Sequence, residues 1–377
     1  MKRRTKANPG VATVWVRTAG ARYPVWVGSG LLRQAGRRLR QLRPGRRRLF
    51  VVSSPRVWAL WGKELGRGLR AAGVRLEPLL MDDREEKKRL ATVEKLAEEL
   101  LRRGADRGDL LAALGGGVVG DVTGFLAASY MRGVDYVQIP TTLVGQMDSA
   151  IGGKTGVNLR GGKNLVGAFH QPRAVLVDPR TLSSLRGRDY RAGLYEVVKC
   201  AVLGDPALFR FLEENLEPVL ARQPAALGRI LLRSIRLKAR IVARDEREQN
   251  LRRVLNFGHT FGHALEAVTG YRRLRHGEAV GWGMIAATRL AERLGQLPPA
   301  DAGRIIALVH SVGRLPALPR IRPARAYAQL AADKKRRGGA LHFVLPRRIG
   351  QMEICAGLPP AAVRATLREL DAHPAAR

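Results

Sequence analysis

Short apolar runs alternate with helix-like stretches through the first half of the chain. Each run has the length and apolar content of a buried strand, and the stretches between them repeat apolar residues at helical spacing. The runs lie at residues 11–17, 23–27, 49–52, 74–80, 109–114, 137–139 and 174–177. Strands that alternate with helices predict a mostly parallel α/β sheet.

The pattern changes near Pro179, after which long helical periodicities dominate. They cover residues 190–203, 206–215, 225–243, 256–269, 277–294 and 302–312, and only 341–345 has the character of a strand. We therefore predict three parts: a basic tail at 1–10, an α/β domain at 11–179 and a mostly α-helical domain at 180–377.

Composition excludes several classes of protein. The 377 residues are 45% hydrophobic and 26% charged, which is the balance of an ordinary globular chain. Cys200 and Cys355 are too few for a disulfide framework, so we expect a reducing cytoplasm. No window approaches the roughly 18 apolar residues of a membrane span, and the N-terminal residues lack the apolar segment of a signal peptide. We expect no membrane partner.

A net charge of +35 is typical of proteins that bind nucleic acid, so this function has to be considered. Of 67 basic residues 12 are lysine and the rest arginine, and the arginines are spread along the whole chain. No RNA-binding aromatic motif, zinc finger or basic leucine zipper accompanies them. We expect no specific nucleic-acid partner, although a protein that binds polyanions remains the non-enzymatic alternative.

A glycine-rich segment follows the predicted strand at 109–114. Gly115-Gly116-Gly117-Val118-Val119-Gly120 fits the pattern G-x-G-x-x-G, and Asp121 is expected in the first turn of a following helix. Such a loop lets a pyrophosphate approach the backbone at a helix N-terminus, so the segment predicts nucleotide binding. The alternative is a tight turn that needs glycine for a positive φ.

Two glycine-flanked lysines come next. A Gly- and Thr-rich stretch from Ile139 ends on Lys154, and Gly161-Gly162-Lys163-Asn164 repeats the theme nine residues on. Backbone N–H groups and an ammonium suit an anion, whereas the spacing of an ATP-hydrolysing P-loop fails at both lysines. The alternative is a pair of flexible surface loops.

Three of the seven histidines fall within 18 residues. His259 and His263 share a helical face at i, i+4, and His276 opens the next helix. Glu196, inside an apolar segment, is the best carboxylate to complete a zinc-type site. The alternatives are an ion pair of Glu196 with Lys199 and hydrogen-bonded core histidines.

Taken together, nine segments resemble the 3-dehydroquinate synthase family of sugar-phosphate cyclases, in order and from about residue 10 to 370. The segments are Gly115–Asp121, Arg132-Gly133, Pro140-Thr141-Thr142, Asp148–Lys154, Gly162-Lys163-Asn164, Glu196–Lys199, Asp245–Glu248, Leu255–His263 and His276–Ala279.

The resemblance implies a Rossmann-like NAD-binding domain, a helical metal- and substrate-binding domain, one zinc or cobalt ion and a homodimer. The implied reaction converts 3-deoxy-arabino-heptulosonate 7-phosphate to 3-dehydroquinate and phosphate, in the shikimate pathway to chorismate and the aromatic amino acids. NAD would oxidise a hydroxyl transiently, phosphate would leave, and an aldol step would close the ring.

The resemblance also implies a role for each matching residue. The metal ligands would be Glu196, His259 and His276, and the catalytic residues His263, Glu248, Lys154 and Asn164. Substrate contacts would be Asp148, Lys154, Lys163, Asn164, Lys199, Lys238, Arg252, Asn256, one of Lys334 or Lys335, and Arg132 from the neighbouring subunit. NAD contacts would be Glu85, Lys88, Gly116, Gly117, Val118, Asp121, Thr141, Thr142, Asp148, Lys154, Lys163 and the run Thr181, Leu182, Ser183, Ser184.

Two positions depart from the family pattern: Arg84 replaces a glycine and Tyr195 a small residue. A metal-dependent polyol dehydrogenase would share the two-domain layout and the glycine loop, but it would not need Lys154, Lys199 and Lys238. Cyclases that make valiolone- or inosose-type products would be expected to change the carboxylate-binding positions.

Overall fold

The computed structural model describes residues 10–42, 48–270, 273–318, 323–336 and 341–372. The chain forms two compact units, Met1–Leu185 with Leu227–Arg247, and Arg186–Ala226 with Glu248–Arg377. They are called unit 1 and unit 2 below, and each is described by itself. The segment Leu227–Arg247 thus groups with unit 1, whereas the expected domain at 180–377 would have included it. All but the last residue of the expected tail at 1–10 lies outside the described residues.

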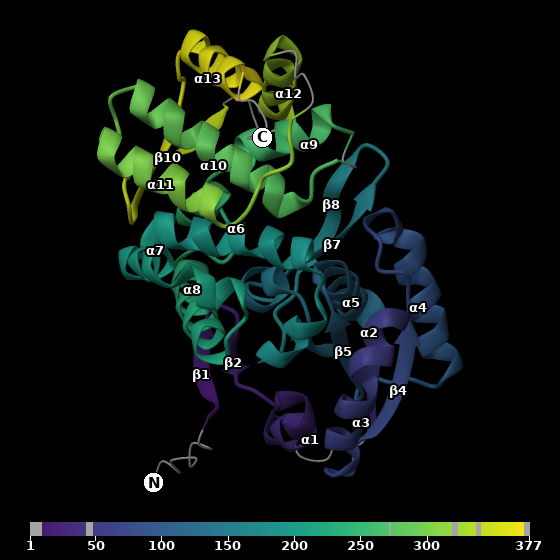
Figure 1. Cartoon of the computed structure of the whole chain (residues 1–377). Helices are drawn as coiled ribbons and strands as arrows, with labels where there is room; N and C mark the ends of the chain where they lie inside the picture. The colour runs from purple at the N-terminus through teal and green to yellow at the C-terminus, as the bar shows by residue number, and fades with distance from the viewer. Residues whose placement is uncertain (1–9, 43–47, 271–272, 319–322, 337–340, 373–377) are drawn as a thin grey trace. The chain divides into compact units, whose positions relative to one another are not determined.

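Unit 1 contains a seven-stranded sheet in the order β1-β2-β9-β6-β5-β3-β4. Figure 1 labels β1, β2, β4 and β5 of this sheet. The first pair is antiparallel and every other pair is parallel, as the alternating pattern predicts. In sheet order the strands are β1 (Ala12–Arg17), β2 (Arg22–Val27), β9 (Val175–Val177), β6 (Asp135–Pro140), β5 (Leu110–Gly115), β3 (Arg48–Ser53) and β4 (Arg75–Leu80).

Helices cover both faces of this sheet because successive side chains of a strand point to opposite faces. Leu49 and Val51 of β3 pack with α1 (Leu31–Leu42) and α3 (Lys63–Arg70). Phe50 and Val52 pack with α4 (Leu90–Arg102) and α5 (Gly117–Ser129). The sheet is therefore doubly wound, and its parallel strands read as continuous apolar runs.

The two glycine-flanked lysines lie on a β-hairpin, so their interpretation as surface loops is wrong. Lys154 begins β7 (Lys154–Leu159), and Lys163 lies in β8 (Gly162–Phe169). Helix α5 packs closely against this hairpin, because a Cβ on Gly124 would overlap the side chain of Thr155.

Unit 2 is mostly helical. Its helices are α6 (Gly187–Gly204), α7 (Pro206–Leu220), α9 (His259–Val268), α10 (His276–Arg293), α11 (Pro299–Ser311), α12 (Pro323–Arg336) and α13 (Pro360–Ala372), with a hairpin of β10 (His342–Arg348) and β11 (Gln351–Ala356). Helix α10 is the central one, since nearly every residue from Gly277 to Ala291 is buried. The helix expected at 256–269 begins only at His259, because Leu251–Asn256 forms a 3₁₀ turn.

The remaining helical segments are short, apart from α8 (Pro224–Arg244), which contributes residues to both units. They are α2 (Pro55–Val57), the π-type turns Trp58–Gly62 and Gly145–Ser149, and the 3₁₀ turns Glu85–Lys87, Tyr130–Arg132 and Pro179–Ser184. Among the described residues, no helix combines the length and apolar character needed to cross a bilayer.

Candidate functional site

The strand order places a ligand crevice in unit 1. From β3 the chain moves outward to β4, then returns to form β5 on the other side of β3. Ligands of open α/β sheets bind where the order reverses in this way, beyond the carboxyl ends of the strands. Those ends are Ser53 of β3 and Gly115 of β5, so the glycine-rich segment begins at the switch point.

The glycines of this segment allow other groups to approach the backbone closely. Gly115, Gly116 and Gly117 all have ordinary φ angles, so the tight-turn alternative is wrong. A Cβ on Gly116 would lie 3.0 Å from the Thr142 methyl carbon. Gly116 caps α5 without any side-chain hydrogen bond, which leaves the first N–H groups of the helix for an anion. Because α5 begins at Gly117, Asp121 lies in its second turn and not in its first turn as expected.

A buried lysine links two predicted NAD contacts, itself and Asp121, to the predicted substrate contact Asn164. Lys88 is 4% exposed, and its Nζ is 2.5 Å from Asp121 Oδ2 and 2.5 Å from Asn164 Oδ1. Asn158 joins the same network by donating to Glu85 Oε1 at 2.7 Å. Burial raises the pKa of Asp121, and the Lys88 ammonium acts against that rise. The structure thus brings residues from four segments of the sequence together.

Arg84 does not distort this network. Its φ of −67° and ψ of 144° are ordinary extended values, so the position needs no glycine. The guanidinium pairs with Asp82 two residues earlier and points into solvent. This departure from the family pattern is accommodated locally.

The other predicted contacts of unit 1 differ in exposure. Asp148 pairs with the buried Lys238 of α8, while Lys154 and Lys163 are exposed on the hairpin. In the turn Pro179–Ser184, Thr181 and Leu182 are fully buried, and Thr181 accepts a hydrogen bond from Gln146 at 2.8 Å. The roles of these residues remain predictions.

In unit 2 three side chains converge as a metal site requires. His276 Nε2 lies 3.6 Å and His259 Nε2 3.8 Å from Glu196 Oε1. The three residues can each offer one ligand atom, and these atoms all lie within 4.8 Å of one another. One carboxylate and two imidazoles form a typical donor set for zinc or cobalt.

Glu196 supports the fit to a cation. Its side chain is 1% exposed, and neither carboxylate oxygen has a hydrogen-bond partner of good geometry. Lys199 Nζ lies 2.5 Å from Oε2, so the expected ion pair forms beside the histidines and does not exclude them. A buried carboxylate in this state is stabilised by a metal ion.

The histidines differ in their protonation. Burial and the nearby Lys199 ammonium lower the pKa of His259 well below its ordinary value, which favours the neutral imidazole that binds metals. For His276 burial acts in the same direction, but Glu266 and Glu196 outweigh it and raise the pKa.

Small residues let the three helices carrying these ligands come close. A Cβ on Gly277 of α10 would overlap the backbone oxygen of Ala192 in α6. A Cβ on Gly283 of α10 would likewise overlap the backbone oxygen of Gly258, just before α9. His276 directly precedes Gly277, and His259 directly follows Gly258. The close contacts between the helices therefore set the positions of these two ligands.

Gly277→Ala is therefore expected to destabilise the chain by about 3 kcal/mol and to weaken zinc binding, because α10 must move away from α6. Urea unfolding and a zinc titration measure the two effects. Gly303→Ala is the matched control: Gly303 lies in α11 with nothing near its Cβ position, so alanine should stabilise by about 0.5–1 kcal/mol. Equal stability of the two variants would contradict the packing argument.

The remaining predicted residues of unit 2 lie at or near these helices. Asn256 donates to Glu248 Oε1 at 2.9 Å, Arg252 is 2% exposed, and the His263 ring centroid lies 5.9 Å from that of His276. Lys334 and Lys335 lie in α12, but their side chains fall outside what the structure describes.

Three predicted residues have a left-handed backbone. Arg132, Asn164 and Glu248 have φ angles of 66°, 55° and 58°. Such conformations cost energy for residues other than glycine and cluster at functional sites. Met131 and Arg222, which have no predicted role, share this conformation, so the roles of the three residues remain predictions.

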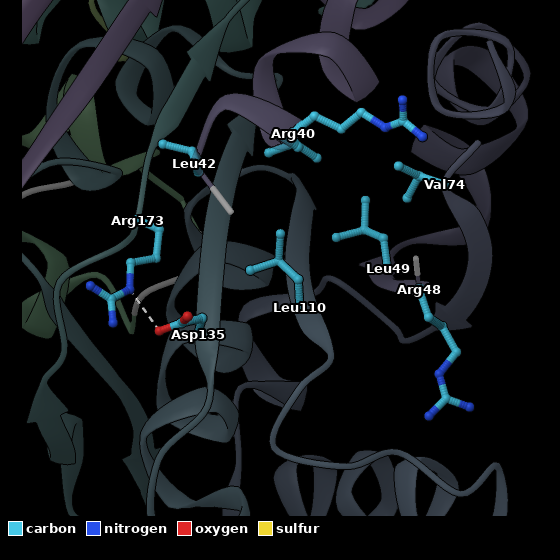
Figure 2. Close-up of a pocket in the computed structure, with 9 residues that line it drawn as sticks. Arg40, Leu42, Arg48, Leu49, Val74, Leu110, Asp135 and Arg173 are labelled. Atoms are coloured by element: carbon cyan, nitrogen blue, oxygen red, sulfur yellow. Dashed lines mark hydrogen bonds and ion pairs between the residues drawn. The ribbon is translucent and has the colours of Figure 1, made fainter. Parts of the chain in front are cut away.

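Figure 2 shows a further pocket of unit 1. It is lined by Leu49, Leu110 and Asp135 at the amino ends of β3, β5 and β6, and Arg173 pairs with Asp135 at its edge. The glycine loop lies at the opposite, carboxyl ends. The pocket is therefore not part of the candidate site.

Sequence reasoning missed two buried carboxylates and the setting of Tyr195. Glu266 lies 3.6 Å from His276 Nδ1, and it could have been found as the i+7 partner of His259 on one helical face. Glu278 accepts a hydrogen bond from the backbone N–H of Arg275. A glutamate at the third position of a helix often makes this contact, so the sequence pattern could have indicated the helix start. The Tyr195 hydroxyl donates to Gly313 O at 3.0 Å.

Comparison with known proteins gives matches over most of the chain. The family models for the N-terminal and C-terminal parts of 3-dehydroquinate synthase match residues 78–192 and 193–336. A 3-dehydroquinate synthase of Solibacter usitatus is 48% identical over 355 residues, covering 94% of this chain and 98% of that relative. One of Caulobacter vibrioides is 44% identical, covering 95% and 99%.

Solved structures show the same fold. A 2-epi-5-epi-valiolone synthase of Streptomyces hygroscopicus with NAD⁺ and Zn²⁺ bound has a TM-score of 0.83 and 33% identity, covering 97% of this chain and 99% of that one. A 2-deoxy-scyllo-inosose synthase with carbaglucose-6-phosphate, NAD⁺ and Co²⁺ gives 0.85 and 26%, covering 95% and 99%. An iron-containing alcohol dehydrogenase of Thermotoga maritima shares the fold alone, at 0.68 and 16%, covering 95% and 99%.

Proposed function

The chain belongs to the 3-dehydroquinate synthase family, and we propose that it converts 3-deoxy-arabino-heptulosonate 7-phosphate to 3-dehydroquinate and phosphate. The observation that carries the proposal is the convergence of Glu196, His259 and His276, with Oε1 of Glu196 buried, facing both imidazoles and lacking a hydrogen-bond partner. The glycine loop at the switch point of unit 1 supports NAD as the second cofactor.

We assign each group of residues a separate chemical role. When bound, NAD takes and then returns one hydride, and the metal ion supplies a Lewis acid for substrate hydroxyls. The amino end of α5 would hold the pyrophosphate of NAD, and Lys88 fixes the carboxylate of Asp121, a predicted NAD contact. His263 moves protons near the departing phosphate, and Asn256 orients Glu248 for acid–base work.

The substrate carries a carboxylate and a phosphate, which favours a set of basic residues. Lys238 and Arg252 are 8% and 2% exposed, so each holds its charge away from bulk water. Together with Asn256 they are the residues that we assign to recognition of the substrate carboxylate. This set favours 3-dehydroquinate formation over valiolone- or inosose-type products, although the enzymes that make them share the fold.

The test is phosphate release from the heptulosonate phosphate with and without NAD. We expect NAD to be required but not consumed, so phosphate should accumulate over many turnovers without a rise in absorbance at 340 nm. Steady NADH formation with glycerol or a similar alcohol would instead indicate a polyol dehydrogenase. A salt-sensitive gel shift with DNA and no phosphate release would indicate a polyanion-binding protein.

We also propose that two copies associate and that the enzyme works in the cytoplasm. Arg132 is exposed with a left-handed backbone, as expected for a residue that reaches into a neighbouring subunit. Leu165 and Phe169 of β8 are 59% and 48% exposed, which suits an interface. Both cysteines are buried and neither forms a disulfide, consistent with a reducing compartment. Sedimentation of wild type and Leu165→Asp tests the association.

A further inference from the structure

The imidazole of His276 lies between two buried carboxylates. Its Nε2 is 3.6 Å from Glu196 Oε1, and its Nδ1 is 3.6 Å from Glu266 Oε2. Glu266 is 4% exposed and comes from α9, the helix that begins with His259. The two carboxylates therefore face the two different nitrogens of one ring.

The second histidine of the cluster has the same arrangement. His259 directs Nε2 toward Glu196 Oε1 at 3.8 Å, and its Nδ1 is 3.2 Å from the backbone oxygen of Phe257. An acceptor at Nδ1 holds the proton there and leaves the lone pair of Nε2 for a metal ion. In both rings the atom that faces Glu196 is thus the one free to bind.

We propose that Glu266 is a positioning residue, which accepts a hydrogen bond from Nδ1–H of His276 and so directs Nε2 toward Glu196 and His259. The inference rests on the proposed metal site at Glu196, His259 and His276. It assigns a role to a residue outside the ligand set.

A competing arrangement makes Glu266 itself a ligand, because His263, Glu266 and His276 also place their ligand atoms within 4.8 Å of one another. The state of the two carboxylates favours the first arrangement. Oε1 of Glu196 faces both imidazoles and is buried without a hydrogen-bond partner, while Lys199 lies beside Oε2; Glu266 has no buried oxygen without a partner. Oε1 of Glu196 is therefore the carboxylate oxygen left for a metal ion.

The test measures zinc affinity of the purified full chain, without substrate, by competition with a chromogenic chelator. Glu266→Leu removes the acceptor and should weaken zinc binding by about 100-fold, while Glu266→Gln keeps an acceptor oxygen and should weaken it by roughly 10-fold. Asp205→Asn is the matched control: this buried carboxylate accepts a hydrogen bond from the Leu208 N–H at the start of α7, and its replacement should leave affinity unchanged.

Absorption spectra of the protein saturated with cobalt(II) distinguish a positioning role of Glu266 from direct binding of Glu266 to the metal. If Glu266 positions His276, Glu266→Gln should keep the intensity of four-coordinate bands and shift them slightly. Loss of metal from Glu266→Gln as complete as from His276→Ala would identify Glu266 as a ligand and overturn the inference. Where Glu266→Leu fails to fold, as judged by its melting curve, Glu266→Gln carries the affinity test alone.

Failure of this inference differs from failure of the proposed function. Wild-type zinc affinity in both Glu266 variants would overturn the positioning role and leave the proposed function standing. Tight zinc binding by wild type without phosphate release would overturn the proposed function and leave the positioning role. A wild-type chain that binds no divalent metal would overturn both.

Discussion

Replacing His276 with alanine is expected to abolish phosphate release and to lower zinc affinity more than the roughly 100-fold that loss of an outer-shell partner costs. The substitution leaves Glu196 Oε1 with His259 alone among the clustered histidines. Because the His276 side chain is 44% exposed, alanine leaves no buried cavity, and the chain should melt near the temperature of the metal-free wild type.

Zinc content after dialysis, turnover and a melting curve together check this prediction. His310→Ala is the control, since His310 lies in the last turn of α11 against Trp282 and outside the cluster. It should retain zinc and activity. In parallel, a chelator should inactivate the wild type, and added zinc or cobalt should restore it. Full turnover by metal-free protein would contradict the metal assignment.

The sheet of unit 1 was predictable because its signals are local. Each parallel strand is buried on both faces and reads as an apolar run, and the glycine loop directly follows one of them. The hairpin of β7 and β8 was not predictable in the same way. Its strands pair across Gly156 and Gly167, residues with little strand preference, and much of β8 is exposed. Packing of Thr155 against Gly124 of α5, distant in sequence, supports it.

The ligand cluster was predictable only in part, for the same reason. Helical spacing places His259 and His263 on one face, and their ring centroids are 5.4 Å apart. Spacing cannot show that His276 approaches both, because that depends on the contacts of Gly277 and Gly283 between helices. Nor can it show that Lys88 joins Asp121 and Asn164, since sequence separations of 33 and 76 residues carry no local signal.

A second large effect is expected from Lys154→Arg and Lys163→Arg. Only 12 of the 67 basic residues are lysine, and seven of these lie at or beside positions that the family resemblance assigns to substrate or cofactor. In a chain so biased toward arginine, interchangeable positions would mostly carry arginine. A lysine ammonium is a compact point charge, whereas a guanidinium is planar and wider. We expect turnover to fall at least ~100-fold, because a displacement near 1 Å can cost that much.

The hairpin geometry separates the two lysines. Lys154 pairs in register with Phe169 at one end, and Lys163 lies beside Gly162, which pairs with Leu159 at the other. At about 3.3 Å per residue the two positions are more than 10 Å apart along the strands. Lys163 adjoins Asn164, which contacts the Lys88 network, so Lys163→Arg should raise the apparent KM for NAD. Lys154 adjoins the segment of Asp148, so Lys154→Arg should mainly lower kcat.

Steady-state kinetics on these variants, with melting curves to exclude misfolding, check the prediction. Lys63→Arg and Lys95→Arg are matched controls, because both lysines are exposed on helices of unit 1 and outside every motif. They should change kcat and KM by less than about twofold, since surface substitutions of this kind are nearly neutral. If the hairpin substitutions were as silent as these two, Lys154 and Lys163 would act as ordinary surface cations. Anion recognition would then rest on Lys199, Lys238 and Arg252, all of which are buried.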